Sequence, residues 1–195
     1  MIEEAVARRA KEFAPGLQMQ PEHWSQIVTL PASIAKLKSV KKLYLYRSHL
    51  VRIPVEIGEM ENLESFDAYT SYRLHWLPYE ITRCKKLTQS RMSTRALYGN
   101  YKYRPPFPRL EEVSLPSQLA KYQMAYKCSV CDAELPDSGS HQVWISLRVG
   151  TDIMPLLVNA CSETCIQRLP PPAKGFVDHS HRGGLDLQQP VAHYM

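Results

Sequence analysis

The stretch VKKLYLYRSHLVRIPVEIGEM, residues 40–60, decides how this chain is expected to fold. Seven apolar residues recur in it at fixed spacing: Val40, Leu43, Leu45, Leu50, Ile53, Ile57 and Met60. Alternation around 43–45 predicts a short strand, and the segment from Pro54 to Met60 predicts a short helical return. One such unit cannot bury its apolar face alone, so the pattern requires similar units stacked on either side.

Copies of this unit flank it on both sides. An apolar-Pro dipeptide followed after two variable residues by isoleucine occurs three times, with its prolines at 31, 54 and 78, which are 23 and then 24 residues apart. A degenerate copy follows at 87–98, and an earlier one survives as Ile27, Leu30, Ile34 and Leu37. The period of 23 to 24 residues is typical of a repeat architecture.

This pattern resembles the leucine-rich repeat family over roughly residues 25–98, about 40% of the chain. The resemblance implies an α/β fold, a short solenoid of parallel strands with helical or 3-10 returns. Ser48 stands where the family usually has an asparagine that bonds buried backbone, a role that a hydroxyl can also serve.

The ends of such a solenoid expose apolar edges and need caps. Residues 2–13, IEEAVARRAKEF, predict an amphipathic helix with Ile2, Val6 and Phe13 on or near one face. A Pro-Gly pair at 15–16 ends it. We therefore expect residues 1–24 to form an N-terminal capping helix and a linker.

Four of the five cysteines stand in two close pairs, Cys128 with Cys131 and Cys161 with Cys165. Pairs spaced by two or three residues let a turn present both sulfurs to one ion, and four thiolates suit tetrahedral zinc. The sequence therefore predicts a structural zinc site with these four ligands.

The residues between the pairs favour a small zinc module over 121–172. HQVWISLRV (141–149) and MPLLVNA (154–160) flank the turn residues GTD and predict a hairpin. Ser162 is placed to cap a helix that runs through Glu163 to Leu169. The first cysteine pair, the hairpin and the second pair at the start of a helix together resemble a treble-clef or ribbon-type zinc finger. Such a module would close the C-terminal end of the solenoid.

Other interpretations of the cysteines fit less well. Two disulfides need an oxidising compartment, and a redox C-x-x-C is expected beside a βαβ pattern. Catalytic zinc keeps an open fourth position, which four cysteines would fill. A RING-type ubiquitin ligase needs eight ligands, and adding His141, His179 and His181 gives seven. The fifth cysteine, Cys84, takes a framework position of the repeat and is expected in the core, not as a nucleophile.

In leucine-rich repeats, residues that alternate with the strand framework face the concave side, where partners bind. The resemblance therefore implies these partner-binding residues: Lys42, Tyr44, Tyr46, Asp67, Tyr69 and Arg91. Ser65, Gln89 and Ser93 are expected on the same face. Tyrosine and arginine are enriched in binding hot spots. An ordinary solvated strand face, with tyrosines packed on one another, stays an open alternative.

The segment RALYGNYKYRPPFPRL (95–110) mixes three tyrosines, four basic residues and three prolines. Aromatics interleaved with Arg and Lys can stack on bases, which favours a nucleic-acid interface. The alternative is a connector over 99–120 that turns at Gly99-Asn100, buries its tyrosine rings and runs extended across the solenoid end. The tail, 173–195, is proline- and glycine-rich, and we expect it to be extended or partly disordered with exposed histidines.

Composition is that of a globular protein of 195 residues, 44% hydrophobic and 22% charged, with a modest net charge of +5. The start lacks the apolar region of a secretory signal, so a reducing, cytoplasmic location without a membrane span is expected. No triad, carboxylate pair or phosphate loop is present, which predicts a non-catalytic protein-interaction module. A nucleic-acid binder that uses the zinc module and residues 95–109 is the main alternative, and an enzyme with a site assembled from scattered residues stays open.

Overall fold

The structure is a computed structural model that describes residues 1–110, 127–136 and 140–191. Its elements follow in chain order: α1 (Ile2–Ala7), β1 (Glu12–Phe13), α2 (Pro15–Gln18), α3 (Pro21–Gln26), η1 (Ala32–Lys36), β2 (Lys42–Tyr44), η2 (Val55–Glu59), β3 (Ser65–Ala68), β4 (Leu77–Pro78), η3 (Tyr79–Arg83), β5 (Gln89–Met92), η4 (Thr94–Ala96), β6 (His141–Val149), β7 (Asp152–Ala160) and α5 (Glu163–Gln167). The η elements are 3-10 helices. The predicted α/β class is confirmed.

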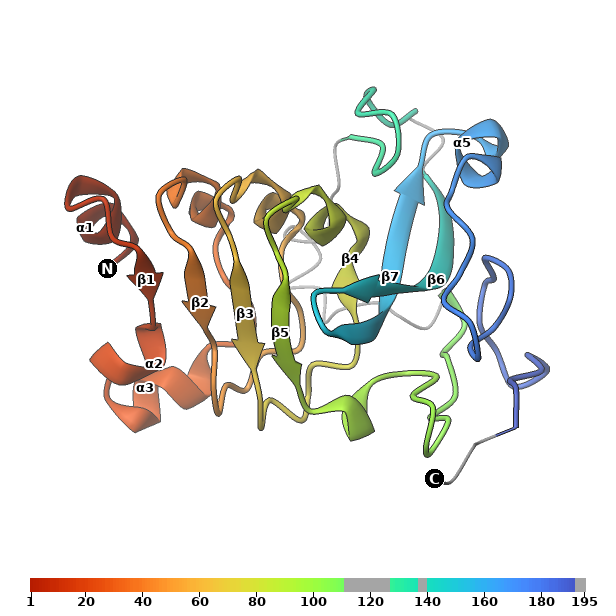
Figure 1. The fold of residues 1–195 in the computed structure, drawn as a ribbon, viewed down its shortest axis with the longest axis horizontal. Helices are drawn as coiled ribbons and strands as arrows, with labels where there is room; N and C mark the ends of the chain where they lie inside the picture. The colour runs from red at the N-terminus through yellow and green to blue at the C-terminus, as the bar shows by residue number, and fades with distance from the viewer. Residues whose placement is uncertain (111–126, 137–139, 192–195) are drawn as a thin grey trace.

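A four-stranded parallel sheet of order β1-β2-β3-β5 runs through the first half of the chain (Figure 1). Lys42 pairs with Ser65, and Ser65 pairs with Gln89, so the sheet register follows the proline spacing. The helices η1, η2 and η3 pack on one another in the same succession. The apolar residues of each unit point between the strands and the helices, and Leu43, Ile57 and Phe66 are 0% exposed.

Serine hydroxyls bond the buried backbone where the chain leaves the strands. Ser71 Oγ donates to Leu45 O at 3.0 Å and accepts bonds from the backbone N–H and the hydroxyl of Ser48, at 3.2 and 2.7 Å. Ser93 Oγ accepts the N–H of Thr70 at 2.7 Å. A short row of hydroxyls thus satisfies groups that would otherwise be buried without a partner.

The N-terminal helix is shorter than the sequence predicts. It ends at Ala7, Arg9 takes a left-handed φ of 48°, and Glu12–Phe13 forms β1 beside β2. The prediction of helix over 8–13 is therefore wrong. The N–H groups of Lys41 and Lys42 both donate to Lys11 O, and Phe13 is 2% exposed, so edge pairing and burial outweigh the local helical preference.

The predicted hairpin forms from β6 and β7, which pair from His141 with Ala160 to Val149 with Asp152. Strand β7 also pairs in parallel with β4, which gives a second sheet of order β4-β7-β6. Figure 1 shows this sheet and α1 at opposite ends of the four-stranded sheet. The turn of the hairpin touches β5, because Thr151 Oγ1 donates to Ser90 O at 2.7 Å and Ser90 Oγ donates to Asp152 Oδ2 at 2.8 Å.

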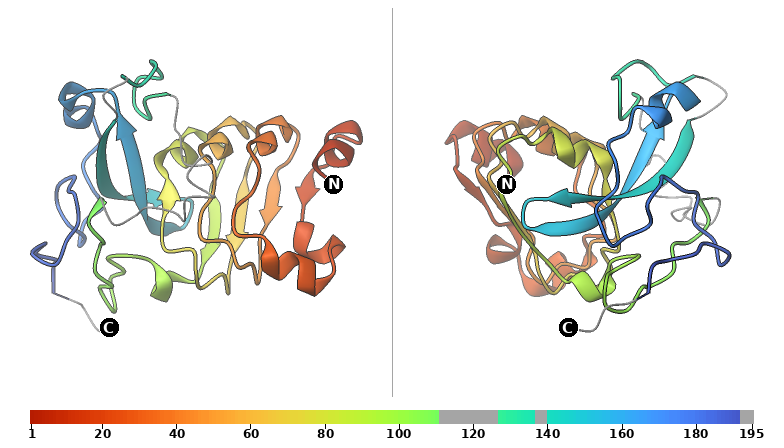
Figure 2. Two further views of the ribbon diagram at one scale, coloured as in Figure 1. Left: turned by 180° about the vertical axis from the view of Figure 1, so that it is seen from behind. Right: turned by 45° about the vertical axis from the view of Figure 1, so that its right-hand side comes forward.

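A second apolar cluster joins the connector and the tail to the hairpin. Its buried members are Trp76, Phe107, Leu110, Trp144 and Leu157. The tail passes beside β6, where Trp144 and His181 exchange backbone hydrogen bonds of 2.7 and 3.1 Å (Figure 2). His181 is 6% exposed, so the prediction of a solvent-exposed histidine is wrong there.

The connector turns as predicted, with Gly99 at a φ of 64° and Phe107 fully buried. Tyr101 and Tyr103, however, are each 49% exposed, so the predicted burial of their rings is wrong. The rest of the predicted connector, residues 111–120, lies outside the described residues. Within the described residues, no helix has the length and apolar character needed to cross a membrane.

Candidate metal centre and candidate binding face

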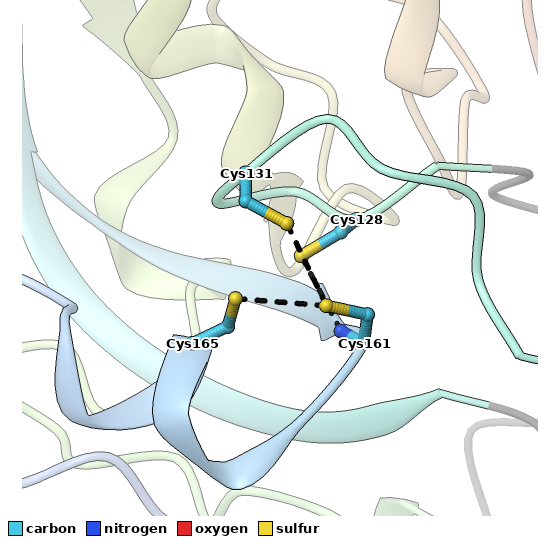
Figure 3. A group of neighbouring side chains, drawn as sticks. All are labelled: Cys128, Cys131, Cys161 and Cys165. Atoms are coloured by element: carbon cyan, nitrogen blue, oxygen red, sulfur yellow. Dashed lines mark hydrogen bonds between the residues drawn. The ribbon is translucent and has the colours of Figure 1, made fainter.

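The structure brings the four paired cysteines together. Their Sγ atoms all lie within 4.8 Å of one another, and Cys161 Sγ is 3.6 Å from both Cys131 Sγ and Cys165 Sγ (Figure 3). A tetrahedral zinc ion with Zn–S bonds of about 2.3 Å places its sulfur ligands about 3.8 Å apart. The donor set and its spacing therefore fit a tetrahedral thiolate metal site.

Backbone groups prepare this cluster for a cation. Cys128 Sγ accepts the N–H groups of Val130 and Cys161, at 3.4 and 3.3 Å. Burial acts to raise the pKa of Cys128, but backbone N–H bonds from Cys131, Cys161 and Val130 outweigh it and lower the pKa to about 6. Thiol hydrogen bonds with Cys131 and Cys165 raise the pKa of Cys161 to about 12. A divalent ion would take the place of the protons that these thiols hold.

The second cysteine pair is set by a capped helix. Ser162 Oγ accepts the N–H of Cys165 at 3.3 Å, as predicted, and α5 runs to Gln167, two residues short of the predicted end. Cys84 lies apart from the cluster, 4% exposed in the main core, and burial raises its pKa to about 12. Its predicted place as a core residue is confirmed.

Side chains of η3 bind the turn that carries Cys128 and Cys131, which we call the cysteine turn. Arg83 Nη2 donates to Cys128 O at 3.3 Å and to Ser129 O at 3.1 Å, and Arg83 Nη1 pairs with Asp132 Oδ1 at 3.0 Å. Ser129 Oγ donates to Glu80 Oε1 at 2.7 Å and accepts the N–H of Asn159 at 2.9 Å. Burial raises the pKa of Glu80. Sequence reasoning missed Glu80 and Arg83, because both stand at variable positions of the repeat.

On the strand face, four of the predicted partner-binding residues form one unit. The rings of Tyr46 and Tyr69 stack with centroids 6.2 Å apart, and the Arg91 guanidinium lies 6.0 and 5.3 Å from them. Asp67 Oδ2 accepts bonds from Arg91 Nε and Nη2, at 2.9 and 2.6 Å. We call Tyr46, Tyr69 and Arg91 the tyrosine platform.

The other two predicted residues, Tyr44 and Lys42, differ in whether they line a groove beside the platform. Tyr44 lines a groove that borders the platform, whereas Lys42 pairs with Glu12 Oε1 at 2.8 Å and does not line it. The groove holds about 700 Å³ and lies between this strand face and the segment that carries α2 and α3. Leu17, Pro21 and Trp24 line it from that segment, and Arg47 and His49 line it from the turn after β2. No sequence signal connects residues 17–24 with the strand face.

Similarity to known proteins is found among solved structures. No family model matches the chain, and no curated protein matches it. Seven chains of solved structures match, among them a leucine-rich repeat protein of Leptospira interrogans. That protein is 28% identical over 34% of this chain, with a TM-score of 0.32, and the match spans 18% of its own length.

Proposed function

We propose that this protein is a non-catalytic protein-interaction module, a leucine-rich repeat scaffold whose strand face binds another polypeptide. The observation that carries the proposal is the tyrosine platform beside a groove of about 700 Å³. Tyrosine and arginine dominate binding hot spots, since each combines a large contact area with hydrogen-bonding groups.

The platform is organised before any partner arrives. Both tyrosine rings are 44% exposed, yet they are held by mutual stacking and by Arg91, which Asp67 holds in turn. Ordering of side chains is a main cost of association, so a face that is already ordered binds with less loss of entropy. The stacking of the two tyrosines alone would also fit an ordinary solvated strand face. The bonds from Arg91 to Asp67 and the adjoining groove are what favour a binding face.

In this proposal the four-cysteine cluster holds one structural zinc ion. Four thiolates complete the tetrahedral shell and leave no position for water or substrate, which is typical of zinc that stabilises a fold. The bonds from Arg83 and Glu80 support a role in securing residues 128–136 to the repeats. Elemental analysis of the purified protein is expected to find one zinc per chain.

Binding is tested by capture of partners with the native chain and with a Tyr46→Ala, Tyr69→Ala, Arg91→Ala variant. The control is Tyr101→Ala, which removes an equally exposed tyrosine on the connector. We expect the polypeptides held by the native chain and by the control to be lost from the platform variant, with melting temperatures unchanged. Recovery of the same polypeptides by all three proteins would rule out this face.

A second candidate function rests on the connector. Tyr103 is exposed, and Arg95 and Lys102 lie 5.4 and 5.6 Å from its ring, an arrangement that would accept a stacked base beside phosphates. A nucleic-acid binder would be retained on a single-stranded DNA column with a steep salt dependence that Tyr103→Ala weakens. Elution at low salt from columns of any sequence would exclude it.

A further inference from the structure

We propose that the groove takes an acidic peptide segment, an extended stretch of a partner with one apolar side chain followed by Asp or Glu. The apolar side chain would lie against Leu17 and Trp24, and the carboxylates would lie over Arg47 and Arg73. This inference rests on the proposed function, because it names the chemistry of the partner at the same face.

Part of the groove lining is apolar. Leu17 is 87% exposed although it lines a hollow beside Pro21 and the mostly buried Trp24. Trp24 is fixed in place, since its Nε1 donates to Tyr46 O at 3.4 Å and a Cβ on Gly16 would lie 2.7 Å from that nitrogen. An exposed leucine in a concave, rigid setting suits a single apolar side chain of a ligand.

The part of the groove that adjoins a second hollow is cationic. A second hollow of about 580 Å³ shares Tyr46, Arg47 and His49 with the groove and adds Tyr72 and Arg73. Neighbouring basic residues on the strand face are neutralised, Lys42 by Glu12 and Arg91 by Asp67. Arg47 and Arg73 form no ion pair with any carboxylate among the residues that the structure describes. Two guanidinium groups beside tyrosine rings are suited to bidentate carboxylate binding.

The backbone conformation of Arg47 concerns the same site. Its φ is 55°, in the left-handed region, and Thr70, one unit further along, has a φ of 61°. Glycine adopts this conformation without steric cost, whereas other residues are strained in it. The left-handed turn therefore belongs to the repeated unit. What is particular to Arg47 is that it occupies this turn among the residues that line both hollows.

A carboxylate-bearing peptide fits this charge pattern better than a nucleic acid. Among the residues that line the groove and the second hollow, only two guanidinium groups lack a partner carboxylate within the described chain, and the carboxylates of Asp67 and Glu12 stand on the same sheet. Nucleic-acid sites neutralise a series of phosphates, so they need a longer row of free cations. A peptide that carries a few carboxylates among apolar or neutral residues needs only the two guanidinium groups of Arg47 and Arg73.

The test is selection of displayed random 12-residue peptides on the full-length chain, followed by fluorescence anisotropy with synthetic copies of the selected peptides. We expect sequences with an apolar residue beside two or more acidic ones. Arg47→Gly is expected to weaken their binding about tenfold at low salt, and the difference should shrink as salt screens the charges. Arg73→Ser is expected to act in the same direction.

Arg9→Gly is the matched control. It introduces glycine at another left-handed position, with a φ of 48°, and removes an exposed arginine that lines neither hollow, so it should bind within about twofold of the native chain. Both glycine variants should melt at or above the native temperature because they relieve strain, so weakened binding by Arg47→Gly alone is a loss of the guanidinium and not of the fold.

Each remaining outcome is decisive. Selected peptides that need the tyrosine platform but carry no acidic excess would overturn the acidic segment and leave the proposed function standing. Peptides that bind the Tyr46→Ala, Tyr69→Ala, Arg91→Ala variant, the Arg47→Gly variant and the native chain equally well would overturn both. Displacement of the peptide by a 12-nucleotide single-stranded DNA that binds more tightly would assign the face to nucleic acid instead.

Discussion

Replacement of Ser129 by alanine should weaken the attachment of the cysteine turn, which carries Cys128 and Cys131, to η3 and β7. The Ser129 hydroxyl is the central atom of a buried bridge: it donates to Glu80 Oε1 at 2.7 Å and accepts the N–H of Asn159, on β7, at 2.9 Å. Ser129 is 3% exposed and Glu80 is 4% exposed, so water does not readily replace the lost hydroxyl. Both partners of the hydroxyl would be left buried without it.

The expected loss follows from these two bonds. A hydrogen bond to a charged group contributes about 1.5–3 kcal/mol, and a buried N–H without a partner costs about 1–3 kcal/mol. Uptake of a proton by Glu80, whose pKa burial already raises, would relieve part of the loss. We therefore expect Ser129→Ala to lower the free energy of unfolding by about 3–5 kcal/mol, a large part of the roughly 5–15 kcal/mol of an ordinary domain.

Urea unfolding of the zinc-saturated protein, followed by tryptophan fluorescence, measures this loss. The control is Ser146→Ala, since Ser146 is also 3% exposed but its hydroxyl forms no hydrogen bond within the described chain. We expect that control to change the free energy of unfolding by less than about 1 kcal/mol. Equal, small losses for the two variants would refute the reasoning that this hydroxyl secures the cysteine turn.

Three further predictions concern other parts of the fold. Burial, reinforced by the charge of His179, lowers the pKa of His181 to about 4, so the unfolded chain binds this proton first. Stability should therefore fall as pH drops from about 6.5 towards 4, by up to about 3 kcal/mol, and His181→Gln should remove that part of the slope in urea melts. Removal of the zinc by a chelator should lower the melting temperature. Cys165→Ser should lower it too, with no chelator added. An unchanged melting temperature in either experiment would contradict a structural metal. Gly150→Ala should lower the free energy of unfolding by about 2 kcal/mol, because φ is 60° and the new Cβ would lie 2.9 Å from Ser90 N. Gly175, with a φ of 85°, has open space around it, so Gly175→Ala should show the backbone cost alone in the same urea melts.

Much of the site was predictable wherever its residues are close in sequence or share the repeat register. The stacking of Tyr46 on Tyr69 follows from a period of 23 residues, because equivalent positions of parallel strands lie side by side. The cysteine ligands followed from two short pairs, and the hairpin between them brings the pairs together. These are consequences of local pattern, so one sequence is enough to infer them.

The amino-acid sequence by itself determined the parallel α/β arrangement, the hairpin and the composition of the cysteine cluster, because apolar periodicity and ligand spacing are local properties. Only the tertiary structure decided that Phe13 pairs at the sheet edge instead of extending the first helix, that His181 is buried beside Trp144, and that Leu17 and Arg47 line the same groove. The physical reason is the same in each case. Burial of apolar surface and pairing of backbone groups between distant segments outweigh local preference, and no spacing in the chain records which distant segments will meet.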